Sequence, residues 1–130
     1  LTRIAELISE KSDFGFETTL AGRGHLKLLA HAKSAGYLVC LYYLWMPSVV
    51  RLPSRIRHRV LDGGHDVPTT DVLRRYGRSV ANVADYAALA DVVRVFDATG
   101  PCQQPIYMRN GKETVFRPER VARMRKELGL

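Results

Sequence analysis

The stretch YLVCLYYLWM, residues 37–46, decides the fold that this sequence predicts. It is almost entirely apolar, which is typical of a strand covered on both faces in a parallel sheet. A helical pattern with apolar Leu26, Leu28 and Leu29 precedes it, and Gly36 is placed to end that helix. A helix that leads into a buried strand favours an α/β protein.

The same kind of pattern continues on both sides of this stretch. Periodicity predicts helices at 2–12, 24–35, 48–61, 71–89 and 119–128, strands at 14–18, 37–46 and 91–96, and a hairpin within 104–116. Asn110-Gly111 is a favoured two-residue turn for that hairpin. Strands that alternate with helices predict one α/β domain over 1–130, with a parallel sheet and helices on both of its faces.

Positive charge is the main feature of the composition. The formal net charge is +7, and residues 51–78 contain seven Arg against three Asp. Such a cluster can bind nucleotide phosphates, nucleic acid or an acidic partner. Aromatic residues are not interleaved with it, so we rank nucleotide phosphates first and consider nucleic acid unlikely. No apolar run is long enough to span a membrane, and two isolated cysteines favour the cytoplasm.

The segment Phe14–Arg23 carries the most chemistry. It predicts a short strand that ends in the carboxylate of Glu17, the hydroxyls of Thr18 and Thr19, and the guanidinium of Arg23. Ligands of α/β sheets bind beyond the carboxyl ends of the strands, where such groups can hold a hydroxyl substrate and a phosphate. The alternative is a strand followed by a capped helix, with Thr and Gly as turn residues.

Several stretches together resemble the zeta-toxin-like P-loop kinases, in the branch of predicted ATPases. The matching stretches are Phe14–Arg23, Ala35–Tyr37 leading into Leu44–Pro47, Arg55–Pro68, Arg74–Tyr76 and Val95–Asp97. Their order and spacing are more specific than any single one. The resemblance implies a three-layer P-loop-kinase-like parallel sheet with helices on both faces, incomplete at its N-terminus, followed by a hairpin and a helix.

The resemblance also assigns residues to roles. Glu17 matches the catalytic carboxylate beside the acceptor, and Thr18, Thr19 and Arg23 continue the substrate site. Residues 51–78 correspond to a helical lid, and Asp97 and Thr99 to the loop that borders the nucleotide base. The lid residues that would bind phosphate are Arg55, Arg59, Arg74, Arg75 and Arg78.

This sequence departs from the family at important positions. It contains no Gly-x-x-x-x-Gly-Lys-Ser/Thr phosphate loop and lacks the family's catalytic Asp, which we expect to lie upstream of Leu1. ATP and Mg²⁺ are therefore expected only in the full-length form, and the 130 residues alone are expected to be inactive. His65-Asp66 stands where the family has an Arg, and Ala98-Thr99 where it has Asn-Ser. His65 has no partner at metal-ligand spacing, so no metal site is expected.

Two classes of function follow. The first is a small-molecule kinase that acts on a hydroxyl or phosphorylated acceptor, and the resemblance suggests a nucleotide sugar such as UDP-N-acetylglucosamine. The second is a non-catalytic remnant that binds an anion or a protein, including an antitoxin-like partner. A membrane partner is not expected.

Overall fold

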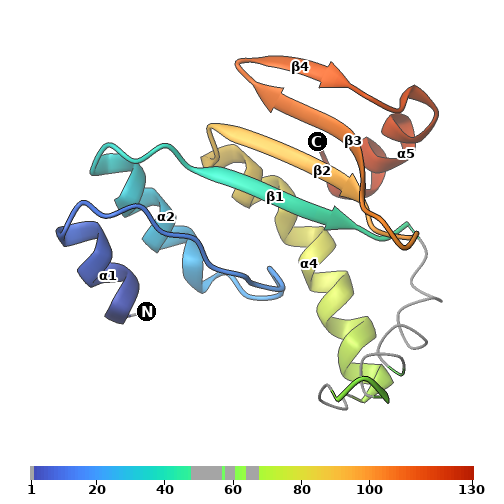
Figure 1. Ribbon diagram of the computed structural model, residues 1–130, viewed down its shortest axis with the longest axis horizontal. Helices are drawn as coiled ribbons and strands as arrows, with labels where there is room; N and C mark the ends of the chain where they lie inside the picture. Colours follow the sequence, from blue (N-terminus) through green and yellow to red (C-terminus); the bar gives the residue numbers. More distant parts are fainter. Residues whose placement is uncertain (1, 48–56, 58–60, 64–67) are drawn as a thin grey trace.

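Parallel pairing of two strands from the middle of the chain organises the molecule (Figure 1). The computed structural model describes residues 2–47, 57, 61–63 and 68–130. The helices are α1 (Thr2–Ser9), α2 (Gly24–Ser34), α4 (Thr69–Leu89) and α5 (Pro118–Leu128). The strands are β1 (Cys40–Trp45), β2 (Val92–Asp97), β3 (Gln104–Asn110) and β4 (Lys112–Val115).

The sheet is mixed and has the order β1-β2-β3-β4. β1 and β2 are parallel, with Cys40 opposite Val92 and Trp45 opposite Asp97. The β3–β4 hairpin continues the sheet in antiparallel fashion and turns at Gly111, whose φ of +72° suits glycine. The expected α/β class and the hairpin are thus confirmed. The sheet was expected to be parallel, but it is mixed, because the hairpin adds two antiparallel strands to the parallel pair.

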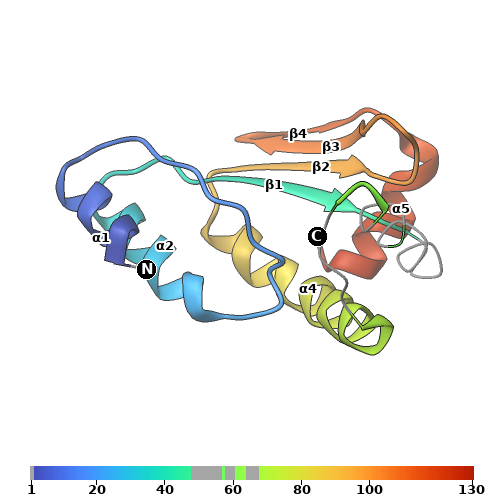
Figure 2. The same cartoon turned by 60° about the horizontal axis from the view of Figure 1, so that its bottom comes forward.

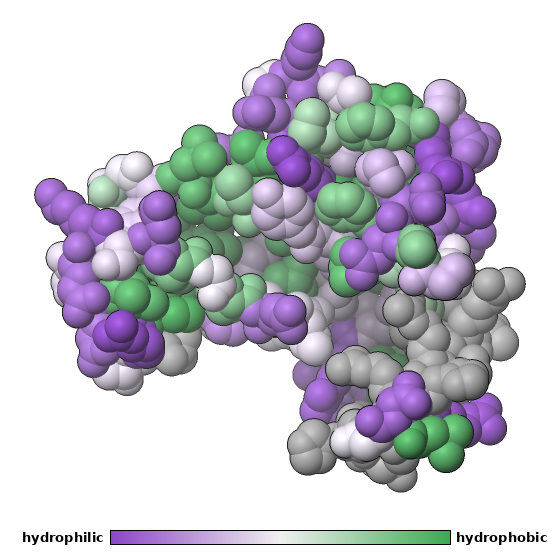
Figure 3. Space-filling model, in the orientation of Figure 1, coloured by the Kyte–Doolittle hydropathy of each residue, from purple (hydrophilic) through white to green (hydrophobic). Residues whose placement is uncertain are grey.

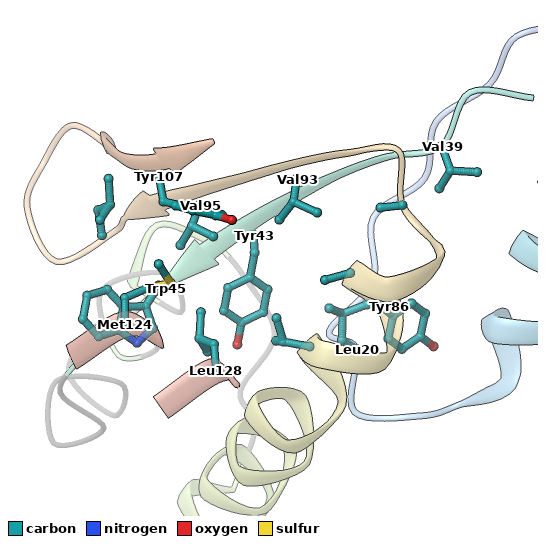
Figure 4. Packing of buried hydrophobic residues seen from close by; sticks show 14 residues of the cluster. Leu20, Val39, Tyr43, Trp45, Tyr86, Val93, Val95, Tyr107, Met124 and Leu128 are labelled. Atoms are coloured by element: carbon teal, nitrogen blue, oxygen red, sulfur yellow. The ribbon is translucent and has the colours of Figure 1, made fainter. Parts of the chain in front are cut away.

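Both α4 and α5 pack on one face of this sheet (Figures 1 and 2). Alternate strand residues point toward them, so that Tyr43, Trp45, Val93 and Val95 meet Met124 in the core (Figure 4). Trp45 and Met124 are 1% and 0% exposed. Each such large side chain stabilises the fold by about 1.5–3 kcal/mol through its removal from water.

The opposite face of the sheet differs from the expectation. Helices were expected on both faces, yet no helix in the described part of the chain lies over the outer face (Figure 2). Tyr42 and Leu44 point outward from β1 and are 56% and 50% exposed. Apolar residues at every position of 37–46 suggested burial on two sides, but one face of β1 remains open.

The strand expected at 14–18 is absent, and this prediction was wrong. These residues adopt no regular structure, and β1 is the edge strand on that side of the sheet. The side-chain oxygens of Thr18 and Thr19 accept hydrogen bonds from the backbone N–H groups of Leu20 and Ala21, at 3.2 and 3.4 Å. Leu20 has a left-handed φ of +55°. These bonds between side chains and nearby backbone groups turn the chain, so the segment does not extend along β1 as a paired strand would.

Other boundaries shift only slightly. The strand expected over 37–46 begins at Cys40, because the N–H of Val39 bonds the Asp91 carboxylate at 2.8 Å. The helix expected over 24–35 corresponds to α2 and is followed by Gly36 in a left-handed conformation. The long helix was expected over 71–89, and α4 begins two residues earlier, after Pro68 and without a side-chain cap. The helix expected at 48–61 lies largely outside the described residues.

The N-terminal segment is attached mainly to α4. The hydroxyl of Tyr86 donates to the carbonyl of Gly22 at 2.7 Å, and the amide of Asn82 donates to the carbonyl of Leu20 at 2.8 Å. The ammonium of Lys33 reaches the carbonyl of Leu89 at 3.0 Å. These bonds fix the end of the 13–20 segment beside the free edge of β1.

Candidate functional site

A groove of about 1240 Å³ separates the 13–20 segment from the edge of β1. Its floor reaches α4, and its long axis is lined by apolar residues such as Phe14, Leu38 and Leu41. Binding sites for drug-sized ligands enclose about 300–1,000 Å³, so this groove has room for a nucleotide-sized molecule. It is the first candidate site of the chain.

Predicted site residues from two distant parts of the sequence meet in this groove. Glu17, Thr18 and Thr19 line it from the N-terminal segment, and Arg75 lines it from α4. All four side chains are solvent-exposed. A carboxylate can orient an acceptor hydroxyl, and a guanidinium can bind a phosphate with two parallel hydrogen bonds. The groove therefore brings together a carboxylate, two hydroxyls and a guanidinium that the sequence predicted for the site.

The contribution of α4 follows helical spacing. Val72, Arg75, Tyr76 and Ser79 line the groove, and their i, i+3, i+4, i+7 spacing places them along one helix face. The sequence interpretation included Arg75 but missed Tyr76 and Ser79. The spacing itself was the signal that could have found them.

Other predicted arginines have different surroundings. Arg23 forms an ion pair with Asp85 of α4, and Arg74 bonds the Asp71 carboxylate at 2.8 Å. Arg78 is exposed on α4, and it is not among the residues that line the groove. Arg55 and Arg59 lie outside the described residues, as does most of the expected lid. Of the predicted phosphate-binding residues that the structure describes, Arg75 alone lines the groove.

A polar network fixes the carboxyl end of β1. The hydroxyl of Tyr76 donates to the carbonyl of Met46 at 2.6 Å, and the hydroxyls of Tyr43 and Ser79 are 3.1 Å apart. Burial raises the pKa of both tyrosines, and the nearby Glu127 carboxylate raises it further. Both hydroxyls therefore stay neutral and can donate at neutral pH.

Asp97 was expected to border a nucleotide base, and its side chain is 6% exposed. One carboxylate oxygen accepts bonds from the backbone N–H and the hydroxyl of Thr99, at 2.9 and 2.5 Å. The other oxygen lies 2.5 Å from the guanidinium of Arg120. Burial raises the pKa of this carboxyl, but the Thr99 bonds and the charges of Arg120 and Arg117 outweigh it and hold the pKa below its ordinary value. These contacts give Asp97 a turn-forming and helix-anchoring role.

Replacement of Arg120 by glutamine should destabilise the fold by about 1–3 kcal/mol, because it leaves the charge of Asp97 with hydrogen bonds from Thr99 alone. A carboxylate with a lowered pKa stabilises the native state above its unfolded pKa and loses this effect as pH falls through its folded pKa. In Arg120→Gln the pKa of Asp97 should rise, so that acid unfolding begins at higher pH. Urea unfolding between neutral pH and about pH 2.5 measures both effects.

The matched control is Arg3→Gln, which breaks the exposed Arg3–Glu6 pair on α1. Exposed pairs contribute at most about 1 kcal/mol, so this variant should retain the wild-type acid midpoint. An Arg120→Gln protein with the stability and acid profile of the control would show that the pair does not anchor α5.

Comparison with known proteins identifies no relative: no family model, no curated protein and no solved structure matches this chain. None of the helices in the described part of the chain is long and apolar enough to cross a membrane. Within the same residues, no three His, Cys, Asp or Glu side chains gather where a metal ion would need them. Both cysteines, Cys40 and Cys102, are free thiols.

Proposed function

We propose that this chain supplies the acceptor-binding part of an ATP-dependent small-molecule kinase. The observation that supports the proposal is the meeting of Glu17, Thr18, Thr19 and Arg75 in one groove along the edge of β1. The resemblance to zeta-toxin-like kinases implies that Glu17, Thr18 and Thr19 belong to the acceptor site and that Arg75 is a lid residue that binds phosphate. It also suggests an acceptor with a hydroxyl and a phosphate, such as a nucleotide sugar.

Phosphoryl transfer requires positioning and charge neutralisation more than covalent help from the protein. The acceptor hydroxyl would donate its hydrogen bond to Glu17, which can receive the proton as the new oxygen–phosphorus bond forms. Arg75 would neutralise a phosphate of the bound substrate. By resemblance, a phosphate loop outside these residues would hold ATP with Mg²⁺. ATP would supply the transferred group, and ADP would leave as the bond between the β- and γ-phosphates of ATP breaks.

Binding of the acceptor can be tested on the 130-residue chain. UDP-N-acetylglucosamine and tripolyphosphate should raise the melting temperature by roughly 5–10 °C at 100 times their Kd, since ligands stabilise the state that binds them. Arg75→Gln should weaken this binding about tenfold or more. The rise in melting temperature should diminish as salt is added, because exposed charges are screened over about 10 Å at 0.1 M.

Lys126→Gln is the control for lost charge, since Lys126 is exposed on α5 and does not line the groove. Its affinity should remain within about twofold of wild type. Equal loss of affinity in both variants would mean that the ligand follows net charge, and the groove would then not be a phosphate site.

A non-catalytic protein-binding module is the second candidate. Leu38 is 71% exposed beside the groove, and the outer edge of β1 makes no backbone hydrogen bond to any other described residue. An edge strand can accept an extended segment of a partner, including an antitoxin-like protein. Failure of every phosphorylated ligand to bind would favour this candidate.

A further inference from the structure

The outer face of the sheet carries exposed aromatic side chains. Tyr42 of β1 and Phe96 of β2 stack with ring centroids 6.5 Å apart and an interplanar angle of 29°. Phe116, directly after β4, is 49% exposed. In Figure 3, which views this face, hydrophobic and weakly polar side chains gather over the strands, with hydrophilic ones among and around them.

An arginine lies among these rings. The guanidinium carbon of Arg94 is 5.4 Å from the centre of the Tyr42 ring, which is a cation–π distance. Arg94 is exposed and forms no ion pair with another described residue. The neighbouring carboxylates are engaged elsewhere: Asp97 with Arg120, and Glu113 with Arg125. The positive charge on this face is therefore available to a ligand.

Strand register shows the charge pattern of the whole face. The two rows of outward side chains that contain the rings are Tyr42–Arg94–Met108–Thr114 and Leu44–Phe96–Pro105. Neither row contains a carboxylate. A hollow of about 270 Å³ lies between Arg94, Phe96, Met108 and Phe116. It is smaller than sites for drug-sized ligands, and its size suits one planar ring system.

We propose that this open sheet face binds single-stranded nucleic acid, with bases stacked on Tyr42, Phe96 and Phe116 and a phosphate bound by Arg94. Exposed aromatic rings on a four-stranded sheet stack bases regardless of sequence, and nearby arginines bind the backbone. The chain's net charge of +7 adds a general attraction to a polyanion.

An apolar protein surface fits this face less well. Such a partner would bury the guanidinium of Arg94 without an opposite charge, which is costly, whereas a nucleic acid neutralises it. The sequence interpretation ranked nucleic acid low because no aromatic residues are interleaved with the basic cluster at 51–78. Strand pairing produces the interleaving instead, from residues more than fifty positions apart.

This site is separate from the kinase proposal. Arg94, Phe96 and Phe116 do not line the groove, whereas Tyr42 borders both surfaces. The test therefore uses Arg94→Gln and Phe96→Leu, because neither residue lines the groove.

Fluorescence anisotropy with labelled oligothymidylate and oligouridylate of about 20 nucleotides measures the binding, since one sheet domain contacts up to about 16. Phe96→Leu keeps an apolar side chain but removes the ring, and it should weaken binding about tenfold. Arg94→Gln should weaken binding and reduce the slope of log affinity against log salt by about 0.7. Lys126→Gln removes the same charge from α5 and should change affinity by less than about twofold.

Three results would overturn the proposal. They are the absence of binding at low salt, an affinity of Phe96→Leu equal to that of wild type, and equal losses in Arg94→Gln and Lys126→Gln. Sedimentation of the free protein tests whether this face is an interface between copies of the chain. That alternative would be identified by self-association that Leu44→Lys abolishes, together with the absence of oligonucleotide binding. Phe116→Leu provides a second ring deletion at a more exposed position if Phe96→Leu fails to fold.

Discussion

Trp45→Ala should destabilise the protein by about 3–5 kcal/mol, a large share of the roughly 5–15 kcal/mol that holds a domain of this size together. Trp45 is 1% exposed at the carboxyl end of β1, between the sheet and α5. Its indole N–H also donates to a Glu127 carboxylate oxygen at 2.9 Å. The substitution removes both the packing and the donor. Urea unfolding measures the loss. Circular dichroism has to follow it, because Trp45 is the only tryptophan and the substitution removes the usual fluorescence signal.

Trp45→Phe separates the two contributions. It keeps an aromatic ring in the core, but it removes the hydrogen bond to Glu127 and leaves a smaller cavity than alanine does. The other Glu127 oxygen is 2.7 Å from the Arg123 guanidinium. We expect a smaller loss, about 1–3 kcal/mol. A Trp45→Ala protein within about 1 kcal/mol of wild type would contradict the core assignment and would mean that α5 does not depend on β1.

Local patterns predicted most of the secondary structure. The apolar periodicity at 2–12 and 71–89 predicted α1 and α4, and Asn110-Gly111 predicted the turn of the hairpin. Each of these signals depends on neighbours within one or two turns of the chain. The parallel pairing of β1 and β2 also followed, because a long helix between two apolar strands favours a crossover.

The expectations that failed depended on distant partners. A strand at 14–18 needed a neighbour to pair with, but a groove separates this segment from β1. A sheet covered on both faces requires a helix over the outer face, and the described residues contain none there (Figure 2). An apolar strand sequence shows which side chains avoid water, but it does not show what covers them.

The site was predicted in part, for the same reason. Glu17 and Arg75 lie more than fifty residues apart, and only the resemblance connected them. Arg74 and Arg75 are neighbours in the sequence, yet one bonds Asp71 and the other lines the groove. Helix geometry explains this divergence, since adjacent residues point about 100° apart. The ion pair of Asp97 with Arg120 has no local signal.

If the proposed function holds, Glu17→Gln should reduce phosphoryl transfer by about 10²–10⁴-fold in a polypeptide that joins a phosphate loop to these residues. Glutamine keeps the size of the side chain and its ability to orient a hydroxyl, but it cannot accept the proton. Glu17 lines the groove from the coil segment, with Thr18 and Thr19 beside it. ATP affinity should remain within about twofold, because in the proposed function the carboxylate would contact the acceptor and not the nucleotide phosphates. Turnover is measured at saturating ATP with varied acceptor.

Glu10→Gln is the matched control, since Glu10 is an exposed carboxylate nearby that does not line the groove. It should leave kcat unchanged. A Glu17→Gln enzyme with near-normal kcat and a raised KM would restrict Glu17 to acceptor binding, and one with both constants unchanged would remove it from the site. If both variants lost activity equally, net charge would be the cause. A loss confined to kcat in Glu17→Gln is the one result expected of a residue that takes the proton from the acceptor, because such a group acts in the transition state and not in the bound ground state.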